Sequence, residues 1–225
     1  MIHLQQSNWR LLHQTAFKLT LVMLTLIPIQ ILVFLFSPPP SSVTGFFQLY
    51  HDNWFLGLLS LDFLYLFNNA IIAILYLSLF VKLVDERPAL IAMGFIIGLI
   101  GIACYFPTNP SFEMWTLSRR YFEANALTQG SFIAAGEGLL AHYTGTAFNV
   151  YYVFNAFTLL AFSYAILKSP QFSRATGYWG LTSGILMSVP SSFGMVGMIF
   201  SLLSLVPWMV FIILLLSRLR QFATE

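Results

Sequence analysis

The sequence predicts an all-α integral membrane protein, a bundle of about six transmembrane helices with one additional amphipathic or re-entrant helical segment. Of the 225 residues, 58% are hydrophobic and 8% are charged, whereas about a quarter of the residues in a soluble domain are charged. So few charges cannot coat a water-soluble surface of this size. Several apolar runs also reach the ~20 residues that a helix needs to cross a bilayer, where a helix satisfies its own backbone hydrogen bonds.

Two spans are predicted near the start of the chain. The first, residues 16–36, is nearly uniformly apolar. It is longer than the apolar region of a signal peptide, about 7–15 residues, and three prolines at 38–40 stand where small cleavage-site residues belong, so we expect it to be retained. Residues 37–53 predict an interfacial loop, because the prolines break the helix and the aromatic residues that follow suit the headgroup boundary. Residues 54–84 predict the second span, which Asp62 interrupts.

The third predicted span, residues 89–106, follows a polar turn. Residues 111–129 are too polar to span the membrane, and residues 130–141 are apolar but short and contain Glu137. We therefore expect residues 111–141 to form an amphipathic helix that leads into a re-entrant or steeply tilted one. The last three spans are predicted at residues 146–167, 176–189 and 195–216, and the whole chain, residues 1–225, is predicted to be a single transmembrane domain.

The distribution of basic residues predicts the topology. If residues 111–141 do not cross the membrane, all the lysines and arginines share one side except Arg119 and Arg120. If these residues cross the membrane fully, the basic residues are instead divided between the two sides. Basic residues favour the cytoplasmic side of a membrane. We therefore expect six spans in a cell membrane, with the N-terminus and the C-terminus cytoplasmic. Seven spans, with the C-terminus outside, are the alternative.

Polar side chains within the spans indicate a candidate site. An ionisable group at bilayer depth costs about 3 kcal/mol on insertion scales, so it usually faces the interior of a bundle. At 100° per residue, Asp62 and Asn69 share one face of the second span. In residues 146–167, Asn149 and Tyr152 also share a face. The first polar stripe also includes Tyr65 and Tyr76, and the second includes Ser163, with Asn155 near its edge. The two stripes are expected to face a common interior.

Residues 111–141 supply the remaining charges. Arg119 precedes Glu123 by four residues, and Glu123 and Glu137 lie on one side of a continuous helix. These charges and Asp62 predict either an ion-pair network that fixes helix register or a polar cavity that holds a ligand. The candidate ligand-binding residues are Asp62, Asn69, Arg119, Arg120, Glu123, Glu137, His142, Asn149 and Tyr152.

Several function classes are excluded or poorly supported. The histidines lack metal-site spacing and Cys104 is the single cysteine, so we expect no metal, no cofactor and no internal disulfide. No basic run could follow a nucleic-acid backbone. The sequence motifs of intramembrane hydrolases are absent, and no catalytic residue is assigned. An enzyme would have to use Glu137, Glu123, Asp62 or His142 in lipid chemistry.

Pairs of glycines four residues apart indicate close helix packing. Gly94 with Gly98, and Gly180 with Gly184, have the small-xxx-small spacing of packed transmembrane helices. We expect them to pack helices within the bundle, with a homo-oligomer as the alternative. The basic residues at the cytoplasmic ends of the spans are expected to snorkel to the headgroups, among them Arg87 and Lys168.

Five short motifs stand out along the chain: Phe67-Asn68-Asn69, residues 118–124, Ala135-Gly136-Glu137, residues 145–148 and residues 169–173. They resemble the motifs of a bacterial family of small multi-pass membrane proteins known only as a domain of unknown function. The resemblance covers roughly residues 62–218. It implies a bacterial inner-membrane protein and carries over no activity and no catalytic residue.

Three functions are compatible with these features. The first is a membrane-embedded protein that binds a small molecule or a lipid in a polar cavity, as a transporter or a sensor does. The second is a lipid-modifying enzyme with a carboxylate as general base. The third is an accessory subunit of a membrane complex. The expected partners are the lipid bilayer and a lipid or small amphiphile.

Overall fold

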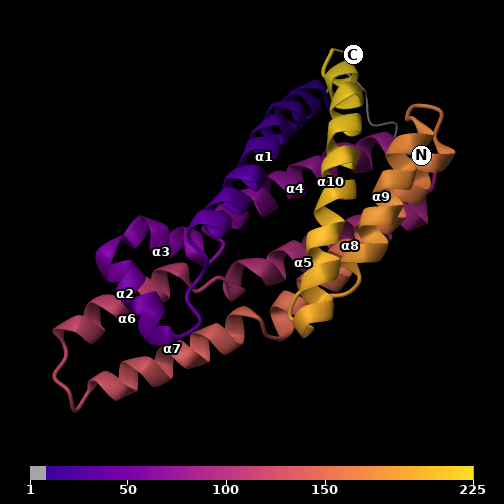
Figure 1. Cartoon of the computed structure of the whole chain (residues 1–225). Coiled ribbons are helices and arrows are strands. Elements are labelled where there is room, and N and C mark those ends of the chain that lie inside the picture. Colours follow the sequence, from indigo (N-terminus) through magenta and orange to yellow (C-terminus); the bar gives the residue numbers. More distant parts are fainter. Residues whose placement is uncertain (1–8, 225) are drawn as a thin grey trace. The chain divides into compact units, whose positions relative to one another are not determined.

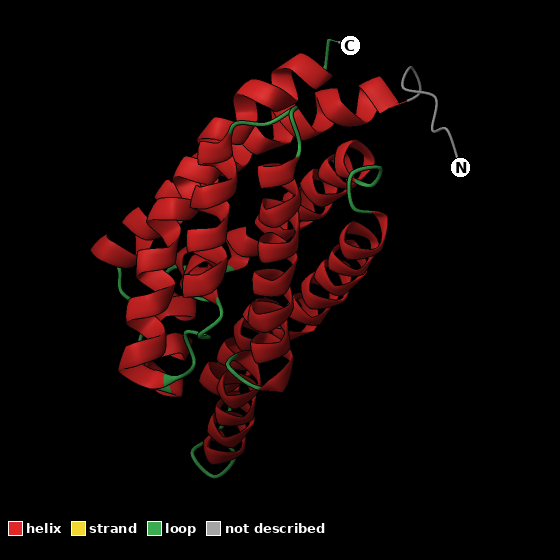
Figure 2. Ribbon diagram, turned by 90° about the vertical axis from the view of Figure 1, so that its right-hand side faces the viewer, coloured by secondary structure: helices red, strands yellow, loops and turns green. Residues whose placement is uncertain are grey.

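The computed structural model describes residues 9–224, and this part of the chain consists of helices joined by short loops, with no strand (Figures 1 and 2). The predicted domain also includes residues 1–8 and 225, which lie outside the described residues. The helices are α1 Arg10–Phe36, α2 Val43–Asp52, α3 Trp54–Ser60, α4 Phe63–Leu83, α5 Pro88–Thr108, α6 Ser111–Glu123, α7 Gln129–Tyr143, α8 Thr146–Lys168, α9 Arg174–Met187 and α10 Gly194–Phe222.

The chain is an all-α membrane bundle. Five helical stretches are long and apolar enough to cross a bilayer. They are Arg10–Phe36, Phe63–Leu83, Pro88–Glu123, Gln129–Lys168 and Gly194–Phe222. Four of the six predicted spans fall within these stretches, and the span predicted at 54–84 overlaps Phe63–Leu83 but extends beyond it. The sixth, predicted at 176–189, corresponds to α9, which has 14 residues and is therefore about 21 Å long, less than the ~30 Å hydrocarbon core.

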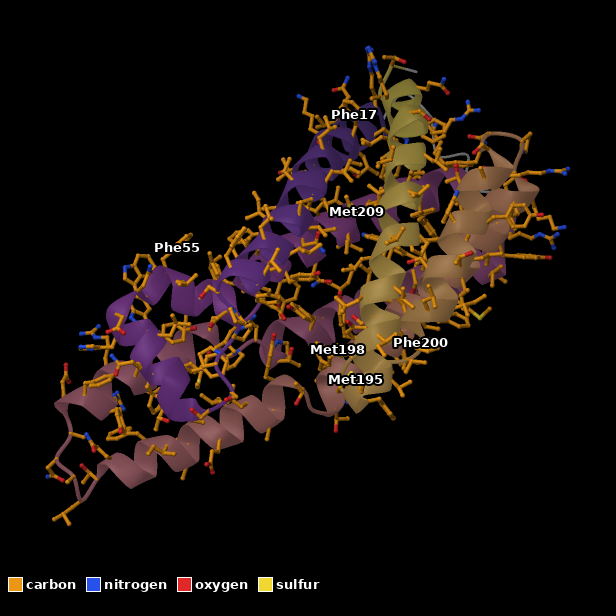
Figure 3. All side chains as sticks on the ribbon, in the orientation of Figure 1. Phe17, Phe55, Met195, Met198, Phe200 and Met209 are labelled. Atoms are coloured by element: carbon orange, nitrogen blue, oxygen red, sulfur yellow. The ribbon has the colours of Figure 1, made fainter. Side chains whose placement is uncertain are left out.

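Large apolar side chains cover the outside of the helices. On α10, Met195, Leu202 and Val206 are each more than half exposed, and Figure 3 shows Met195 and Met198 at the beginning of this helix. Extended apolar surface of this kind is unfavourable in water and normal in lipid. The low charge content of the sequence thus leaves apolar side chains on the outside of the protein.

The structure corrects the prediction that residues 54–84 form one continuous span. The helix ends at Ser60 and a new one begins at Phe63. Between them, Asp62 has a φ of 58°, in the left-handed region that interrupts a right-handed helix. Aspartate adopts this conformation more readily than most residues. In the sequence, Asp62 interrupts the apolar run, but one polar residue does not by itself show that the helix ends there.

The prediction that residues 37–53 form a loop is also wrong. They contain α2, which begins after Ser42, whose side chain accepts a hydrogen bond from the Gly45 backbone N–H at 3.1 Å. Serine in this position is a favoured N-cap. The three prolines follow the end of α1, but they do not prevent a new helix that begins at Val43, three residues after Pro40.

Residues 111–141 form two helices, α6 and α7, as the change in composition predicts. A turn separates them, in which the Asn125 side chain accepts a hydrogen bond from the Thr128 backbone N–H at 3.1 Å. Asparagine commonly makes this local bond and so favours a turn over a continuing helix. Glu123 and Glu137 therefore belong to different helices.

The described residues form two compact units. The first consists of residues up to 25, 69–103 and 149–224. In it, α9 and α10 lie side by side (Figure 1). Arg10 and Gln14 donate hydrogen bonds to the Ala223 carbonyl oxygen at 3.4 and 3.2 Å, so the start of α1 and the end of α10 lie together.

Glycines set the close packing in this first unit. A Cβ atom added to Gly98 would lie 2.7 Å from the Thr158 hydroxyl oxygen, and one added to Gly180 would lie 2.1 Å from the Ser163 hydroxyl oxygen. Both glycines are buried. These positions therefore pack helices within the chain, and association of two copies through them remains a separate prediction.

The second unit consists of residues 26–68 and 104–148, with α2 at its centre. Helix α2 packs against α3, α6 and α7 (Figure 1). The buried core comprises Val43, Phe46, Phe47, Tyr50, Leu58, Leu61 and Met114. The Ser118 hydroxyl donates a hydrogen bond to the Phe47 carbonyl oxygen at 2.7 Å, which joins α6 to α2.

Candidate functional site

The break between α3 and α4 is the centre of a polar cluster in the second unit. Asp62 is the only residue other than glycine with a positive φ in the described part of the chain. Its Oδ2 accepts a hydrogen bond from the Tyr143 hydroxyl at the end of α7. A left-handed non-glycine residue persists only where its surroundings hold it, and such residues occur often at functional sites.

Hydrogen bonds to the neighbouring carbonyl hold this break in place. The Leu61 carbonyl oxygen accepts from Asn109 Nδ2 at 2.6 Å and from the Ser111 hydroxyl at 3.4 Å. Leu61 ends α3, so its carbonyl has no partner within the helix. The Tyr50 hydroxyl donates to the Ser111 carbonyl oxygen at 2.9 Å. Residues from α2, α6 and the loop before α6 thus fix the backbone that carries Asp62.

The end of α7 is anchored independently. His142 Nε2 and the Pro107 carbonyl oxygen lie 3.2 Å apart, a hydrogen bond in which the ring nitrogen donates. The Tyr143 ring also contacts the Phe148 ring, with 6.2 Å between centroids. His142 is exposed and therefore acts here as a helix-end anchor. It positions Tyr143, the residue that touches Asp62.

The surroundings of Asp62 are neutral. Burial raises the pKa of its carboxyl group to about 6, and the Tyr143 hydrogen bond opposes part of this rise. Removal from water disfavours the charged form of an acid, whereas a donated hydrogen bond favours it. The group therefore changes its charge within two pH units of neutrality. No ion pair to Asp62 is present among the residues that the structure describes.

The other predicted polar residues of the spans lie in the first unit. Asn69 is completely buried. Asn149 accepts a hydrogen bond from the Ser192 hydroxyl, and the Tyr152 and Ser201 hydroxyl oxygens are 2.8 Å apart. These three residues belong to a different unit from Asp62, so they are not assigned to its cluster.

The predicted meeting of the polar stripes is confirmed at one contact in this unit. The Tyr76 hydroxyl donates to Asn155 Oδ1 at 3.1 Å, and Asn155 Nδ2 donates to the Tyr151 carbonyl oxygen at 2.9 Å. Tyr76 and Asn155 are both buried. The two stripes therefore satisfy each other's hydrogen bonds at this position.

The predicted ion-pair network is wrong. Arg119, Arg120, Glu123 and Glu137 are all exposed, and no ion pair joins them in the described part of the chain. The physical reason is the orientation of α7. Gly136 is the buried residue of this helix and faces Val43 of α2, so the next residue, turned by about 100°, points away from the core.

Sequence analysis missed most of the residues that hold Asp62 and the backbone around it. Tyr143 and Asn109 are ordinary helix-end residues in the sequence, and Tyr50 lies in a segment that was predicted to be a loop. The sequence does contain one indication of the role of Asn109, since Asn-Pro at 109–110 is typical of a helix start. The structure begins α6 at Ser111 and uses the Asn109 side chain both for the Ser111 backbone N–H and for the Leu61 carbonyl.

Comparison with known proteins gives no independent assignment: no family model, no curated protein and no solved structure matches this chain. The resemblance to a bacterial family of unknown function therefore stays a prediction. The function has to be argued from the residues around Asp62.

Proposed function

We propose that this protein is a membrane-embedded small-molecule or lipid-binding protein, transporter-like or sensor-like, and that Asp62 is its main ligand-binding group. The observation that supports this proposal is a largely buried carboxyl group at a helix break whose protein partner is a neutral hydroxyl, Tyr143. Among the described residues, Asp62 has no second hydrogen bond and no cationic partner. A neutral hydrogen-bond donor of a ligand would supply the second hydrogen bond, and a cationic donor would supply the hydrogen bond and the positive charge.

The position in the fold supports the same proposal. In membrane proteins, irregular backbone is tolerated where it is buried in protein or lines a polar space, and interrupted helices often carry binding sites. Here the interruption is stabilised by Asn109 and Ser111 through the Leu61 carbonyl. The backbone bonds are thus satisfied by other residues, which leaves the Asp62 side chain available for a ligand.

The cellular setting belongs to the proposal. We place the protein in a bacterial inner membrane with both termini in the cytoplasm, which the basic residues support. The contact of Arg10 and Gln14 with Ala223 also supports it, because the start of α1 and the end of α10 then lie on the same side. Partners are the lipid bilayer and a lipid or small amphiphile.

The test is identification of what the purified protein retains. Wild type, Asp62→Asn and Asp52→Asn are purified in the same detergent, and small molecules released from each are identified by mass spectrometry. Asp52 is an exposed carboxylate that accepts a hydrogen bond from Gln48 at 2.9 Å, so Asp52→Asn is a matched control. We expect one compound to be retained by wild type and by Asp52→Asn and to be lost from Asp62→Asn.

Two outcomes would contradict this proposal. Equal retention by all three proteins would show that Asp62 does not bind the compound. A protein partner that co-purifies in all three cases, without any small molecule, would favour the accessory-subunit function.

A further inference from the structure

A second polar feature lies on the surface of the first unit, where two cations border one aromatic ring. The Arg87 guanidinium carbon is 5.8 Å from the centroid of the Tyr164 ring, and Lys168 Nζ is 5.7 Å from the same centroid. Tyr164 is 41% exposed, and both cations are exposed. Because Tyr164 and Lys168 are four residues apart on α8, they share one face of that helix.

Neither cation forms an ion pair with the acids that precede Arg87 in the sequence. Glu86 accepts a hydrogen bond from the Ser169 hydroxyl at 3.1 Å, and Asp85 is exposed. No ion pair involving Arg87 or Lys168 is present among the described residues. Cation–π contacts at exposed sites contribute little, and they leave the positive charge free to attract an anion.

The cluster also lies at the ends of three membrane-spanning stretches. Helix α4 ends at Leu83, α5 begins at Pro88, and α8 ends at Lys168. This is the level at which lipid headgroups meet the protein, and tyrosine, lysine and arginine are typical there. The first turn of α5 contains no acidic residue, so its unpaired N–H groups add to the positive potential.

We propose that Arg87, Tyr164 and Lys168 bind the phosphate of an anionic phospholipid headgroup. Arginine binds phosphate oxygens in a bidentate manner, lysine adds a point charge, and the tyrosine hydroxyl can donate to a third oxygen. The acyl chains of the lipid would lie along the apolar outer surface of the helices. This site is separate in the sequence from Asp62 and does not depend on the function proposed for it.

The test is lipid binding measured by native mass spectrometry. The purified protein is mixed with equal amounts of phosphatidylglycerol and phosphatidylcholine, and bound lipids are counted. Because a basic residue near the membrane surface contributes about a factor of five in affinity for anionic lipid, we expect a preference for phosphatidylglycerol that falls by at least about fivefold in Arg87→Gln/Lys168→Gln. In Arg87→Lys, which keeps the charge but not the bidentate geometry, we expect a preference for phosphatidylglycerol between those of the wild type and the double variant.

The matched control is Arg218→Gln/Arg220→Gln, which removes the same charge from the end of α10, where Arg218 donates to Gln221. It should keep the preference. Equal loss in both double variants would overturn the proposal in favour of diffuse attraction by the whole basic surface. Absence of any preference in the wild type would also overturn it. Displacement of the lipid by inorganic phosphate alone would show that the anion, not the lipid, is the ligand.

Discussion

At the residue scale, Asp62 combines an unusual backbone conformation with a raised pKa of its carboxyl group. Its left-handed φ interrupts the helix, and its carboxyl group is then enclosed near Tyr143. Burial raises the pKa of this group to about 6. The pKa in the unfolded chain is about 3.9. At pH values between about 3.9 and about 6, the folded protein therefore keeps a proton that the unfolded protein has lost.

This difference predicts how stability depends on pH. The stabilising contribution is fully present below the unfolded pKa and is lost as the pH rises through about 6. We expect the melting temperature of the detergent-solubilised wild type to fall between pH 4 and pH 7, relative to Asp62→Asn, by an amount that corresponds to about 1.4 kcal/mol per unit of pKa shift. In Tyr143→Phe, which lacks the opposing hydrogen bond, the fall should extend to higher pH. Parallel melting profiles of wild type and Asp62→Asn would refute this assignment.

At the element scale, the packing of α7 on α2 depends on one glycine. A Cβ atom added to Gly136 would lie 2.5 Å from Val43 Cγ1, whereas nothing lies within 4 Å of one added to Gly138. Valine is β-branched and has little freedom to move aside. The same helix thus contains a glycine that is sterically required and, two residues later, one that is not.

The two glycines therefore predict opposite effects of alanine. Gly136→Ala should lower the free energy of unfolding by about 1–3 kcal/mol through overpacking. Gly138→Ala should leave it unchanged or raise it by up to about 1 kcal/mol, because alanine is the better helix former. Thermal unfolding of both variants in one detergent measures the difference. If both alanines stabilise the protein, α7 does not pack on α2 through Gly136.

At the scale of the whole molecule, the ends of several helices indicate the topology. Lys82 at the end of α4 lies over the Phe222 ring at 4.3 Å, and Phe172, which follows α8, contacts the same ring with 5.6 Å between centroids. Arg10 near the start of α1 bonds to Ala223. These contacts place the beginning of α1 and the ends of α4, α8 and α10 at one level, which is the arrangement that the six-span prediction expects.

A cysteine-accessibility experiment tests this topology. In a Cys104→Ala background, we expect Asp85→Cys, Gln171→Cys and Gln221→Cys to be protected from an impermeant thiol reagent in intact cells, and Thr44→Cys to be labelled. All four positions are exposed on the protein, so protection reports the membrane side rather than burial. Labelling at position 221 together with protection at position 85 would establish the seven-span alternative.

The sequence by itself determined the fold class, because composition and the length of apolar runs depend only on the chemistry of the solvent that surrounds the chain. It also indicated Asp62 as a candidate and the change from a polar to an apolar helical segment within residues 111–141, since both are local signals. It did not determine which charges are buried. Glu123 and Glu137 would share one side of a continuous helix, but the turn at Asn125 separates their helices and both remain exposed.

Only the tertiary structure decided which residues hold Asp62 and its neighbour Leu61. Tyr143 is separated from it by 81 residues, and the Leu61 carbonyl receives its hydrogen bond from Asn109, 48 residues away. Helical periodicity relates residues within one element, whereas these contacts depend on how α2, α6 and α7 pack around the break. The left-handed conformation of Asp62 has the same origin, because contacts between distant segments stabilise a backbone that its own neighbours in sequence would not select.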